Sequence, residues 1–350
     1  MLNWSLVACT FNRQKVLEAS LRTVISQTRL PKQIIIVDAS DNWEASKNSI
    51  FNTLVRESES IQWIYVGSER KSLPYQRNRG LEYCESEVVF YLDDDSFIYP
   101  DCAGEIMEVY EKDEAGIVGG VSTLLVPQMP TSELANKTND ETETAPPPEI
   151  KRNILLEYFI ALWNQPELFI PYDGKFYTHD ISELAQRTYI FSETLFHGCR
   201  MTFRTSIVRE LGGSEEGLMG SAMVEDSDLS YRLSRKYALV IASKAKLFHL
   251  YTEVSRSSRY TNSVVIILNA AFLFLVNTPP TFGSKLVIYR FAIKRLFLEL
   301  IRDLTKPKRG FPHSRGTLKA VLSLHKMFNQ DKSQLRSWYQ DFQADIYSHK

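Results

Sequence analysis

The stretch VVFYLDDDSFIYPD at residues 88–101 decides the fold, because an apolar run ends there in three consecutive carboxylates. β-Branched and aromatic residues without polar alternation predict a strand that is buried on both faces. In an open α/β sheet, ligands bind beyond the carboxyl ends of the strands, where Asp93, Asp94 and Asp95 would lie. Three adjacent carboxylates repel one another, and Mg²⁺ or Mn²⁺ relieves that repulsion by taking hard oxygen ligands. The stretch therefore predicts a metal site at a strand end, with a solvated acidic turn as the alternative.

Apolar strands alternate with helices on both sides of this stretch. Strands are predicted at residues 5–9, 34–37 and 61–66 before it and at 116–121 after it. Asn12 is expected to cap the helix that follows the first strand, and a further helix is expected over residues 101–112. This alternation predicts an α/β fold with a mostly parallel central sheet and flanking helices.

Composition places the chain among ordinary globular proteins and excludes several classes. The 350 residues carry a formal net charge of −1, which gives no reason to expect a nucleic acid as partner. The four cysteines form no CxxC pair and no zinc spacing, so we expect reduced thiols in the core. The N-terminus lacks the basic and long apolar segments of a signal peptide. Together these features predict a cytoplasmic protein.

Two compositional shifts follow the predicted sheet. Residues 127–149 are rich in Pro, Thr, Asn and Glu and are expected to form a mobile loop or an extended spacer. Residues 151–190 are rich in aromatic side chains, which favour a small helical core over a sugar-stacking wall.

The region beyond residue 255 is expected to be helical and basic. The apolar run Val264–Val276 is shorter than the roughly 20 residues that span a bilayer. Residues 285–326 are rich in Lys and Arg. Among them an apolar stripe keeps helical spacing, formed by Ile293, Leu296, Phe297, Leu300, Ile301 and Leu304. A basic amphipathic helix of this kind either lies on anionic lipid or packs against a core with its basic face in water.

Other nucleotide and phosphate chemistries fit the sequence less well. Two aspartates spaced by one residue after an apolar strand also occur in haloacid-dehalogenase-type phosphatases. Three strands precede the pair here, however, and Phe97 stands where that family has Thr or Val. Neither a GxGxxG after the first strand nor a P-loop occurs in the sequence.

Five motifs, in their order along the chain, resemble those of family 2 glycosyltransferases. They are SLVACTFNR at 5–13, QIIIVDAS at 33–40, QRNRG at 76–80, FYLDDDSFIYP at 90–100 and VEDSDLSYRL at 224–233. The resemblance covers about residues 4–252. It implies a GT-A fold and inverting transfer of a sugar from a nucleotide-diphosphate sugar, assisted by Mg²⁺ or Mn²⁺.

The resemblance also implies a role for each matching residue. The residues that would bind the nucleotide-sugar are Thr10, Asp38, Arg77, Asn78, Asp93 and Asp94. Asp95 and His249 would hold the metal, although a lone histidine after a strand is more often a core residue. Asp226 would be the catalytic base, and an acceptor hydroxyl does need a carboxylate within hydrogen-bond reach.

The same resemblance suggests three parts of the chain. A nucleotide-sugar-binding half would span residues 1–121, an acceptor-binding half 122–255 and a helical basic extension 256–350. The acceptor would be a glycan or a lipid-linked saccharide of polysaccharide biosynthesis, presented where the extension contacts the inner face of a membrane. Many relatives carry a second aspartate where this chain has Ala39, so the donor could be a UDP, dTDP or GDP sugar. The competing interpretation is a sugar- or nucleotide-binding module without turnover.

Overall fold

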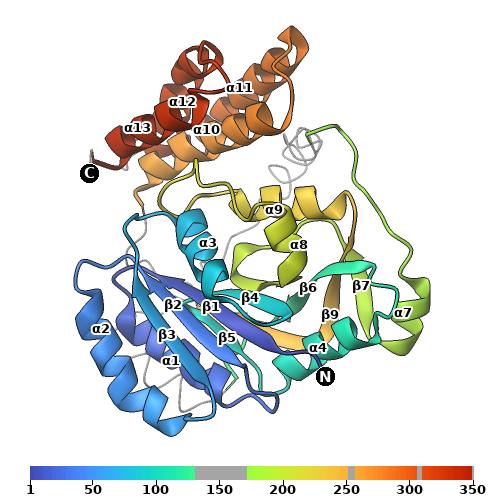
Figure 1. Ribbon diagram of the computed structural model, residues 1–350. Coiled ribbons are helices and arrows are strands. Elements are labelled where there is room, and N and C mark those ends of the chain that lie inside the picture. Colours follow the sequence, from blue (N-terminus) through green and yellow to red (C-terminus); the bar gives the residue numbers. More distant parts are fainter. Residues whose placement is uncertain (131–171, 251–256, 306–309, 349–350) are drawn as a thin grey trace. The chain divides into compact units, whose positions relative to one another are not determined.

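The computed structural model describes residues 1–130, 172–250, 257–305 and 310–348 (Figure 1). The chain divides into two compact units. The first holds Met1–Thr144, Phe176–Glu216 and Glu225–Ser255, and the second holds Ala145–Lys175, Gly217–Val224 and Arg256–Lys350. Residues 131–149 of the predicted loop and residues 151–171 of the predicted aromatic segment lie outside the described residues. The three-part division of the chain stays a prediction.

A nine-stranded mixed sheet forms the centre of the first unit, in the order β3-β2-β1-β4-β8-β6-β9-β5, with β7 paired to β9. Its strands are β1 (Trp4–Thr10), β2 (Gln33–Asp38), β3 (Gln62–Gly67), β4 (Val88–Asp93), β5 (Ser96–Ile98), β6 (Val118–Leu125), β7 (Ile190–Glu193), β8 (Met201–Arg204) and β9 (Ala238–His249). The predicted strands and the GT-A type of α/β fold are therefore present.

The sheet is parallel in its first half and mixed in its second. Strands β3, β2, β1 and β4 are parallel, because a helical crossover connects each to the next along the chain. Strand β5 follows β4 after only Asp94 and Asp95, too few residues for a crossover, and pairs antiparallel with β9. Strand β8 enters between β4 and β6 and runs antiparallel to both. The alternation of elements revealed the parallel half but not these later pairings.

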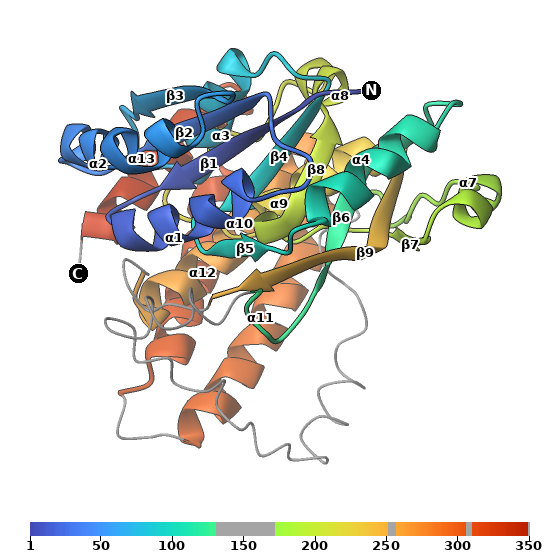
Figure 2. The ribbon, with the colours of Figure 1, turned by 90° about the horizontal axis from the view of Figure 1, so that it is seen from below.

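Helices cover both faces of the sheet, because successive residues of each buried strand point to opposite sides (Figures 1 and 2). Leu6 and Ala8 of β1 pack toward α1 (Gln14–Ile25), α2 (Trp43–Ile50) and α4 (Cys102–Lys112). Val7 and Cys9 pack toward α3 (Leu73–Tyr83), α8 (Thr205–Glu210) and α9 (Glu225–Ser234). The described part of this unit also contains η1 (Phe51–Val55), α7 (Ser182–Arg187) and η2 (Gly198–Arg200). All four cysteines are buried and unpaired.

The expectation that Asn12 caps the first helix is wrong. Arg13 occupies the N-cap position of α1, and its side chain makes no capping hydrogen bond. Asn12 instead has a φ of 53°, a left-handed conformation that asparagine tolerates, and its backbone N donates to Ser40 Oγ at 2.7 Å. The turn after β1 is therefore tied to the turn after β2.

The second unit contains the helices α10 (Arg259–Asn277), α11 (Phe282–Leu304), α12 (Pro312–Phe328) and α13 (Leu335–Ser348). Phe272 of α10 stacks on Tyr339 of α13 with ring centroids 4.9 Å apart. The Tyr339 hydroxyl donates to Asn269 Oδ1 at 2.6 Å, so the polar groups of this core are paired. The expectation of a helical C-terminal region is confirmed.

Helix α10 is longer than the apolar run that predicts it. Among the described residues it is the one helix long and apolar enough to cross a membrane, with 19 residues and a mean hydropathy of 1.6 over its most apolar window. However, 72% of that window is buried in the protein. This burial is typical of the core helix of a soluble bundle.

Gly80 of α3 provides a test of how closely the helices pack on the sheet. A Cβ at this position would lie 2.3 Å from Cγ1 of Val7, a stiff side chain that is buried in β1. We therefore expect Gly80→Ala to lower the free energy of unfolding by ~1–3 kcal/mol in urea titrations followed by circular dichroism.

Gly104 in α4 is the matched control, because its Cβ would meet only Thr28 Oγ1 at 3.8 Å. Gly104→Ala should leave stability unchanged or raise it by about 0.5 kcal/mol through helix propensity. Equal effects of the two substitutions would contradict the close packing of α3 on β1.

Candidate functional site

The candidate site lies where the order of the parallel strands reverses direction. From β1 the chain adds β2 and β3 on one side and then β4 on the other. Ligands in open α/β sheets bind beyond the strand ends at such a switch point. Here the ends of β1 and β4 are joined by a hydrogen bond of 2.6 Å from Thr10 Oγ1 to Asp94 Oδ2.

Arg13 holds two of the three carboxylates that follow β4. Its Nη1 lies 2.7 Å from Asp94 Oδ1, and its Nη2 forms an ion pair with Asp95 Oδ2. Both aspartates are buried, at 3% and 1% exposure, so they require such a partner. Arg13 belongs to the first motif of the chain, yet sequence reasoning assigned it no role.

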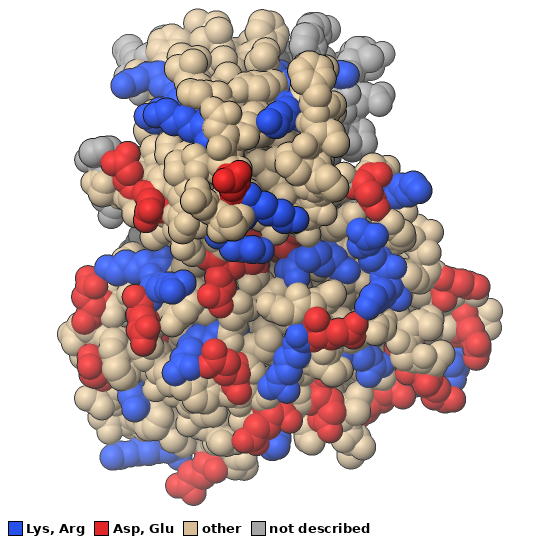
Figure 3. Space-filling view, turned by 45° about the horizontal axis from the view of Figure 1, so that its top comes forward, with Lys and Arg blue, Asp and Glu red and all other residues tan. Residues whose placement is uncertain are grey.

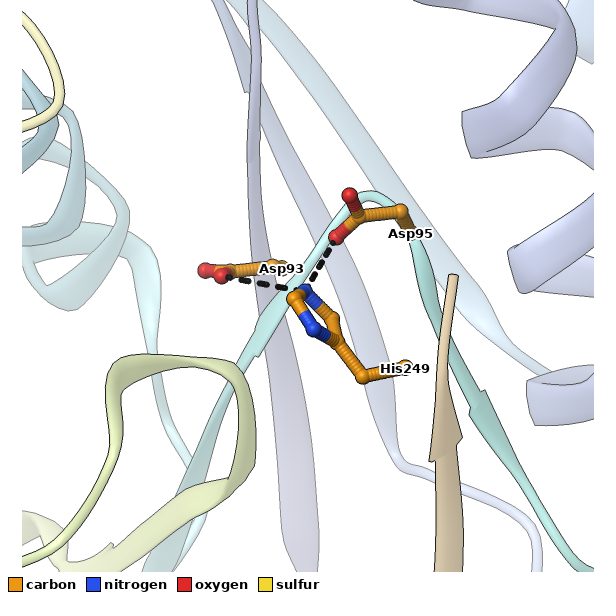
Figure 4. A group of neighbouring side chains, drawn as sticks. All are labelled: Asp93, Asp95 and His249. Atoms are coloured by element: carbon orange, nitrogen blue, oxygen red, sulfur yellow. Dashed lines mark ion pairs between the residues drawn. The ribbon is translucent and has the colours of Figure 1, made fainter. Parts of the chain in front are cut away.

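Strand pairing brings His249 to the same carboxylates. Ser96 of β5 lies opposite His249 at the end of β9, and the backbone N of Leu250 donates to the Asp95 carbonyl at 2.9 Å. His249 Nε2 consequently lies 2.9 Å from Asp95 Oδ1 and 4.0 Å from Asp93 Oδ2 (Figure 4). The histidine is thus part of the acidic cluster rather than an ordinary core residue.

This cluster fits a divalent cation. Asp93, Asp95 and His249 each offer one ligand atom, and these three atoms lie within 4.8 Å of one another. Asp95 Oδ1 is buried and accepts no hydrogen bond from the described residues, although His249 Nε2 lies close to it. Carboxylate oxygens with one imidazole nitrogen form a donor set that suits a divalent metal.

The groups around Asp93, Asp94 and Asp95 shift the pKa values of these three carboxylates in different directions. Burial raises the pKa of Asp94 to about 7, and the Asp95 charge acts in the same direction while Arg13 opposes it. Burial and Asp95 also raise the pKa of Asp93. For Asp95, burial is outweighed by His249 and Arg13, which lower its pKa. Asp95 is therefore the carboxylate best kept ionised, as a metal ligand must be.

Arg77 of α3 connects the acidic cluster of Asp93, Asp95 and His249 to the start of α9. Its side chain is 2% exposed, and its guanidinium pairs with Glu225. Nη2 lies 3.3 Å from Asp93 Oδ1 and 3.0 Å from the Gly198 carbonyl. Burial raises the pKa of Glu225 to about 7, against the opposing effect of Arg77. Arg77 is thus enclosed by protein groups, and it holds Asp93 in position.

Asp226 is half-buried in the first turn of α9. Its Oδ2 accepts a hydrogen bond of 2.8 Å from the Gly198 backbone N, and its Oδ1 accepts one of 2.8 Å from Ser227 N. Gly198 therefore bridges Arg77 and Asp226 through its carbonyl and its N–H. Directly before this helix, Val224 has a φ of 70°, which is strained for a β-branched residue.

Two predicted nucleotide-sugar residues bond to other parts of the protein. Asp38 Oδ2 accepts from the Tyr65 hydroxyl at 2.7 Å, and its Oδ1 accepts from Ser40 N at 2.8 Å. Asn78 donates to the Ser214 carbonyl at 2.9 Å and accepts from Ser214 N at 2.8 Å. These bonds fix the orientation of both side chains, and their predicted contact with a donor stays a prediction.

Three residues of the site had no predicted role: Arg13, Gly198 and Glu225. Arg13 and Glu225 lie inside motifs that the sequence analysis quotes, beside residues that it selects. An acid in the first turn of a helix has a general explanation in the helix dipole, which concealed the pairing of Glu225 with Arg77. Gly198 carried no local signal, because its role depends on three groups that only the fold brings to it.

The mixed sheet and its flanking helices are those of a GT-A fold. Residues 5–153 match the family described as glycosyl transferase family 2. The matched residues include β1, Arg77 and the three carboxylates that follow β4. The resemblance of its motifs is thereby confirmed.

One curated relative is the GalNAc(5)-diNAcBac-PP-undecaprenol beta-1,3-glucosyltransferase of Campylobacter jejuni subsp. jejuni. It is 25% identical over 115 residues, which are 33% of this chain and 37% of the relative. The match therefore spans little more than a third of the relative's length.

Solved structures share the fold at low sequence identity. The mannosyltransferase PcManGT from Pyrobaculum calidifontis, in complex with GDP-Man and Mn²⁺, has a TM-score of 0.51 at 14% identity over 100% of this chain and 88% of its own. GalNAc-T7 with UDP, GalNAc and Mn²⁺ has a TM-score of 0.54 at 14% identity, over 100% of this chain and 58% of its own. TarS of S. aureus with UDP-GlcNAc has a TM-score of 0.51 at 11% identity, covering 100% and 93%.

The pairing of Arg77 with Glu225 gives a prediction on stability. Glu225→Gln would leave the buried guanidinium without its nearest opposite charge, so we expect the free energy of unfolding to fall by about 3 kcal/mol. The matched control is Glu82→Gln in the exposed Arg79–Glu82 pair, where the loss should stay below about 1 kcal/mol. Similar losses in urea unfolding would contradict the structural role of Glu225.

The position of His249 gives a prediction on metal binding. His249→Ala removes one of the three ligand groups, so Mn²⁺ affinity measured by titration calorimetry should fall at least ~10-fold. His325→Ala is the control, because His325 is exposed on α12 and its Nδ1 lies 2.6 Å from the Leu322 carbonyl. Unchanged affinity in His249→Ala would mean that the histidine is no ligand.

Proposed function

We propose that the protein is an inverting glycosyltransferase that moves a sugar from a nucleotide-diphosphate sugar to a lipid-linked saccharide. The observation that carries the proposal is the joining of the Asp93–Asp95–His249 cluster to Asp226 through Arg77 and Gly198. The family match over residues 5–153 and the similarity to a glucosyltransferase support it. A site that pairs a metal-binding group with a separate carboxylate suits a single displacement, which inverts configuration.

The residues of the site would have two roles, binding the cation and accepting a proton. Asp93, Asp95 and His249 would hold the cation, which when bound supplies positive charge to the diphosphate leaving group. Arg13 keeps Asp94 and Asp95 in place from the side of β1. Asp226 would accept the proton of the acceptor hydroxyl, and its hydrogen bonds from Gly198 and Ser227 fix the orientation of its carboxylate.

The donor and the acceptor are proposed as chemical classes. The structural neighbours were solved with GDP-Man, UDP or UDP-GlcNAc, at identities of 11–14% that establish only the fold. The donor class therefore stays a UDP, dTDP or GDP sugar, with Mg²⁺ or Mn²⁺ as the cation. The name of the curated relative specifies an undecaprenol-linked acceptor, so we propose a lipid-linked saccharide at the cytoplasmic face of a membrane.

The haloacid-dehalogenase alternative is set aside, because the carboxylates follow the fourth strand of a GT-A fold. A binding module without turnover remains the competing function. It differs from the proposal in one measurable property, because it would bind the donor and leave the sugar–phosphate bond intact.

The decisive experiment measures release of nucleoside diphosphate from UDP-, dTDP- and GDP-sugars with Mn²⁺, Mg²⁺ or EDTA, with and without an undecaprenyl-diphosphate saccharide. We expect one donor class to be consumed only with metal. Asp226→Asn should lower turnover ~10²–10⁴-fold, as expected for the loss of a general base. Donor affinity in calorimetry should change little, because Asp226 acts on the acceptor.

Asp180→Asn is the control, since Asp180 is an exposed aspartate whose Oδ1 accepts from Ser182 N. It should retain full turnover. Binding of a donor without release under any of these conditions would favour the binding module. Absence of binding to every donor would overturn the proposed function.

A further inference from the structure

Helix α11 of the second unit exposes large apolar side chains to water and buries its two carboxylates. Seven large apolar side chains of α11 are exposed, among them Val287 (46%) and Phe297 (45%). The other five form what we call the outer stripe: Phe282 (85%), Leu286 (59%), Ile293 (57%), Leu300 (41%) and Leu304 (59%). At about 100° per residue, these five positions fall within an arc of roughly 40° on the helix surface. The outer stripe is therefore one continuous line rather than scattered exposure.

The buried side of α11 contains the carboxylates. Glu299 and Asp303 are 5% and 4% exposed, and they are the only acidic residues of α11 and α12. Glu299 Oε1 lies 2.8 Å from Arg295 Nη2, and Asp303 Oδ2 accepts from the N–H and the hydroxyl of Ser314 at 2.7 and 2.8 Å. These partners satisfy the buried acids, so the orientation of the helix is fixed by specific contacts.

Burial of the acids leaves a surface with one sign of charge. The basic residues of α11 are Lys285, Arg290, Lys294, Arg295 and Arg302, and those of α12 are Arg315, Lys319 and Lys326. No carboxylate is exposed on α11 or α12, both of which are described over their full length. The described atoms in the uppermost part of Figure 3 are tan or blue.

We propose that the outer stripe of α11 docks on an anionic lipid bilayer. Exposed apolar side chains in a line bring a free-energy gain when they enter the acyl region, and flanking cations attract anionic headgroups. A second copy of the chain is a poorer occupant, because two such surfaces would bring like charges together. The sequence also allowed a core-packed position for the stripe at residues 293–304. That position does not hold for the exposed Ile293, Phe297, Leu300 and Leu304, whereas Leu296 and Ile301 are half-buried.

This inference deepens the proposed function, since a lipid-linked acceptor is presented at a bilayer surface. It rests on the exposed residues of α11 alone, however, and can be tested without any sugar transfer. The full chain is mixed with vesicles of phosphatidylcholine, or of phosphatidylcholine with phosphatidylglycerol, and floated through a density gradient. We expect binding to the anionic vesicles at low salt and at least ~10-fold weaker binding to the neutral ones.

Two pairs of substitutions separate the contributions of the stripe and of the charges. The double variant Leu286→Ser, Ile293→Ser should bind anionic vesicles about 100-fold more weakly than the native chain, because both native side chains would enter the bilayer. Lys285→Gln with Lys294→Gln should weaken it by about 30-fold and reduce its salt dependence. The matched control is Leu30→Ser, which replaces a leucine of similar exposure (46%) outside α11 and should bind like the native chain.

Several outcomes would overturn the docking. One is equal flotation with neutral and anionic vesicles, and another is native-like flotation of the Leu286→Ser, Ile293→Ser variant. A third is a native chain that does not float and elutes as a dimer, while the same variant elutes as a monomer, since the stripe would then bind a second copy.

Donor hydrolysis without acceptor, measured on every variant, distinguishes the docking proposal from the proposed function. Flotation without hydrolysis would leave the docking intact, whereas hydrolysis without flotation would leave the enzyme intact.

Discussion

The first unit depends on the burial of several carboxylates at the end of β4. Two of them, Asp94 and Asp95, are almost fully removed from water, and such burial is unfavourable unless cations and donors replace the water. Arg13 and Thr10 supply these groups from the end of β1, and His249 supplies another from the end of β9. The same groups that stabilise the acids thus fix three strand ends relative to one another.

A second buried pair extends this arrangement to α9. Arg77 and Glu225 are 148 residues apart in sequence, and both are buried. Arg77 also contacts Asp93 and the Gly198 carbonyl. A displacement of the first turn of α9 would therefore also displace Asp93 of the acidic cluster. The strained φ of Val224 lies directly before this helix, as expected where a fold holds functional groups against local preference. Stability and site geometry are therefore carried by the same contacts.

Sequence reasoning succeeded where the signal is local. The strand before Asp93, the buried parallel strands of the first half and the helical C-terminal region all follow from runs and periodicities within about 10–20 residues. It was less complete for the sheet, because the pairing of β8 between β4 and β6 is set by contacts far apart in the chain. It was wrong for Asn12, whose side-chain type fits both an N-cap and a left-handed turn.

The sequence by itself indicated the resemblance to family 2 glycosyltransferases, the position of the carboxylates at a strand end and the amphipathic character of residues 293–304, because each is a pattern of neighbouring residue types. Only the tertiary structure decided which groups face one another. It brought His249 beside Asp95, placed Gly198 between Arg77 and Asp226, and turned the acids of α11 inward so that its apolar stripe faces out. Periodicity shows that a helix has two faces, but which face is buried depends on the partners that satisfy its polar groups.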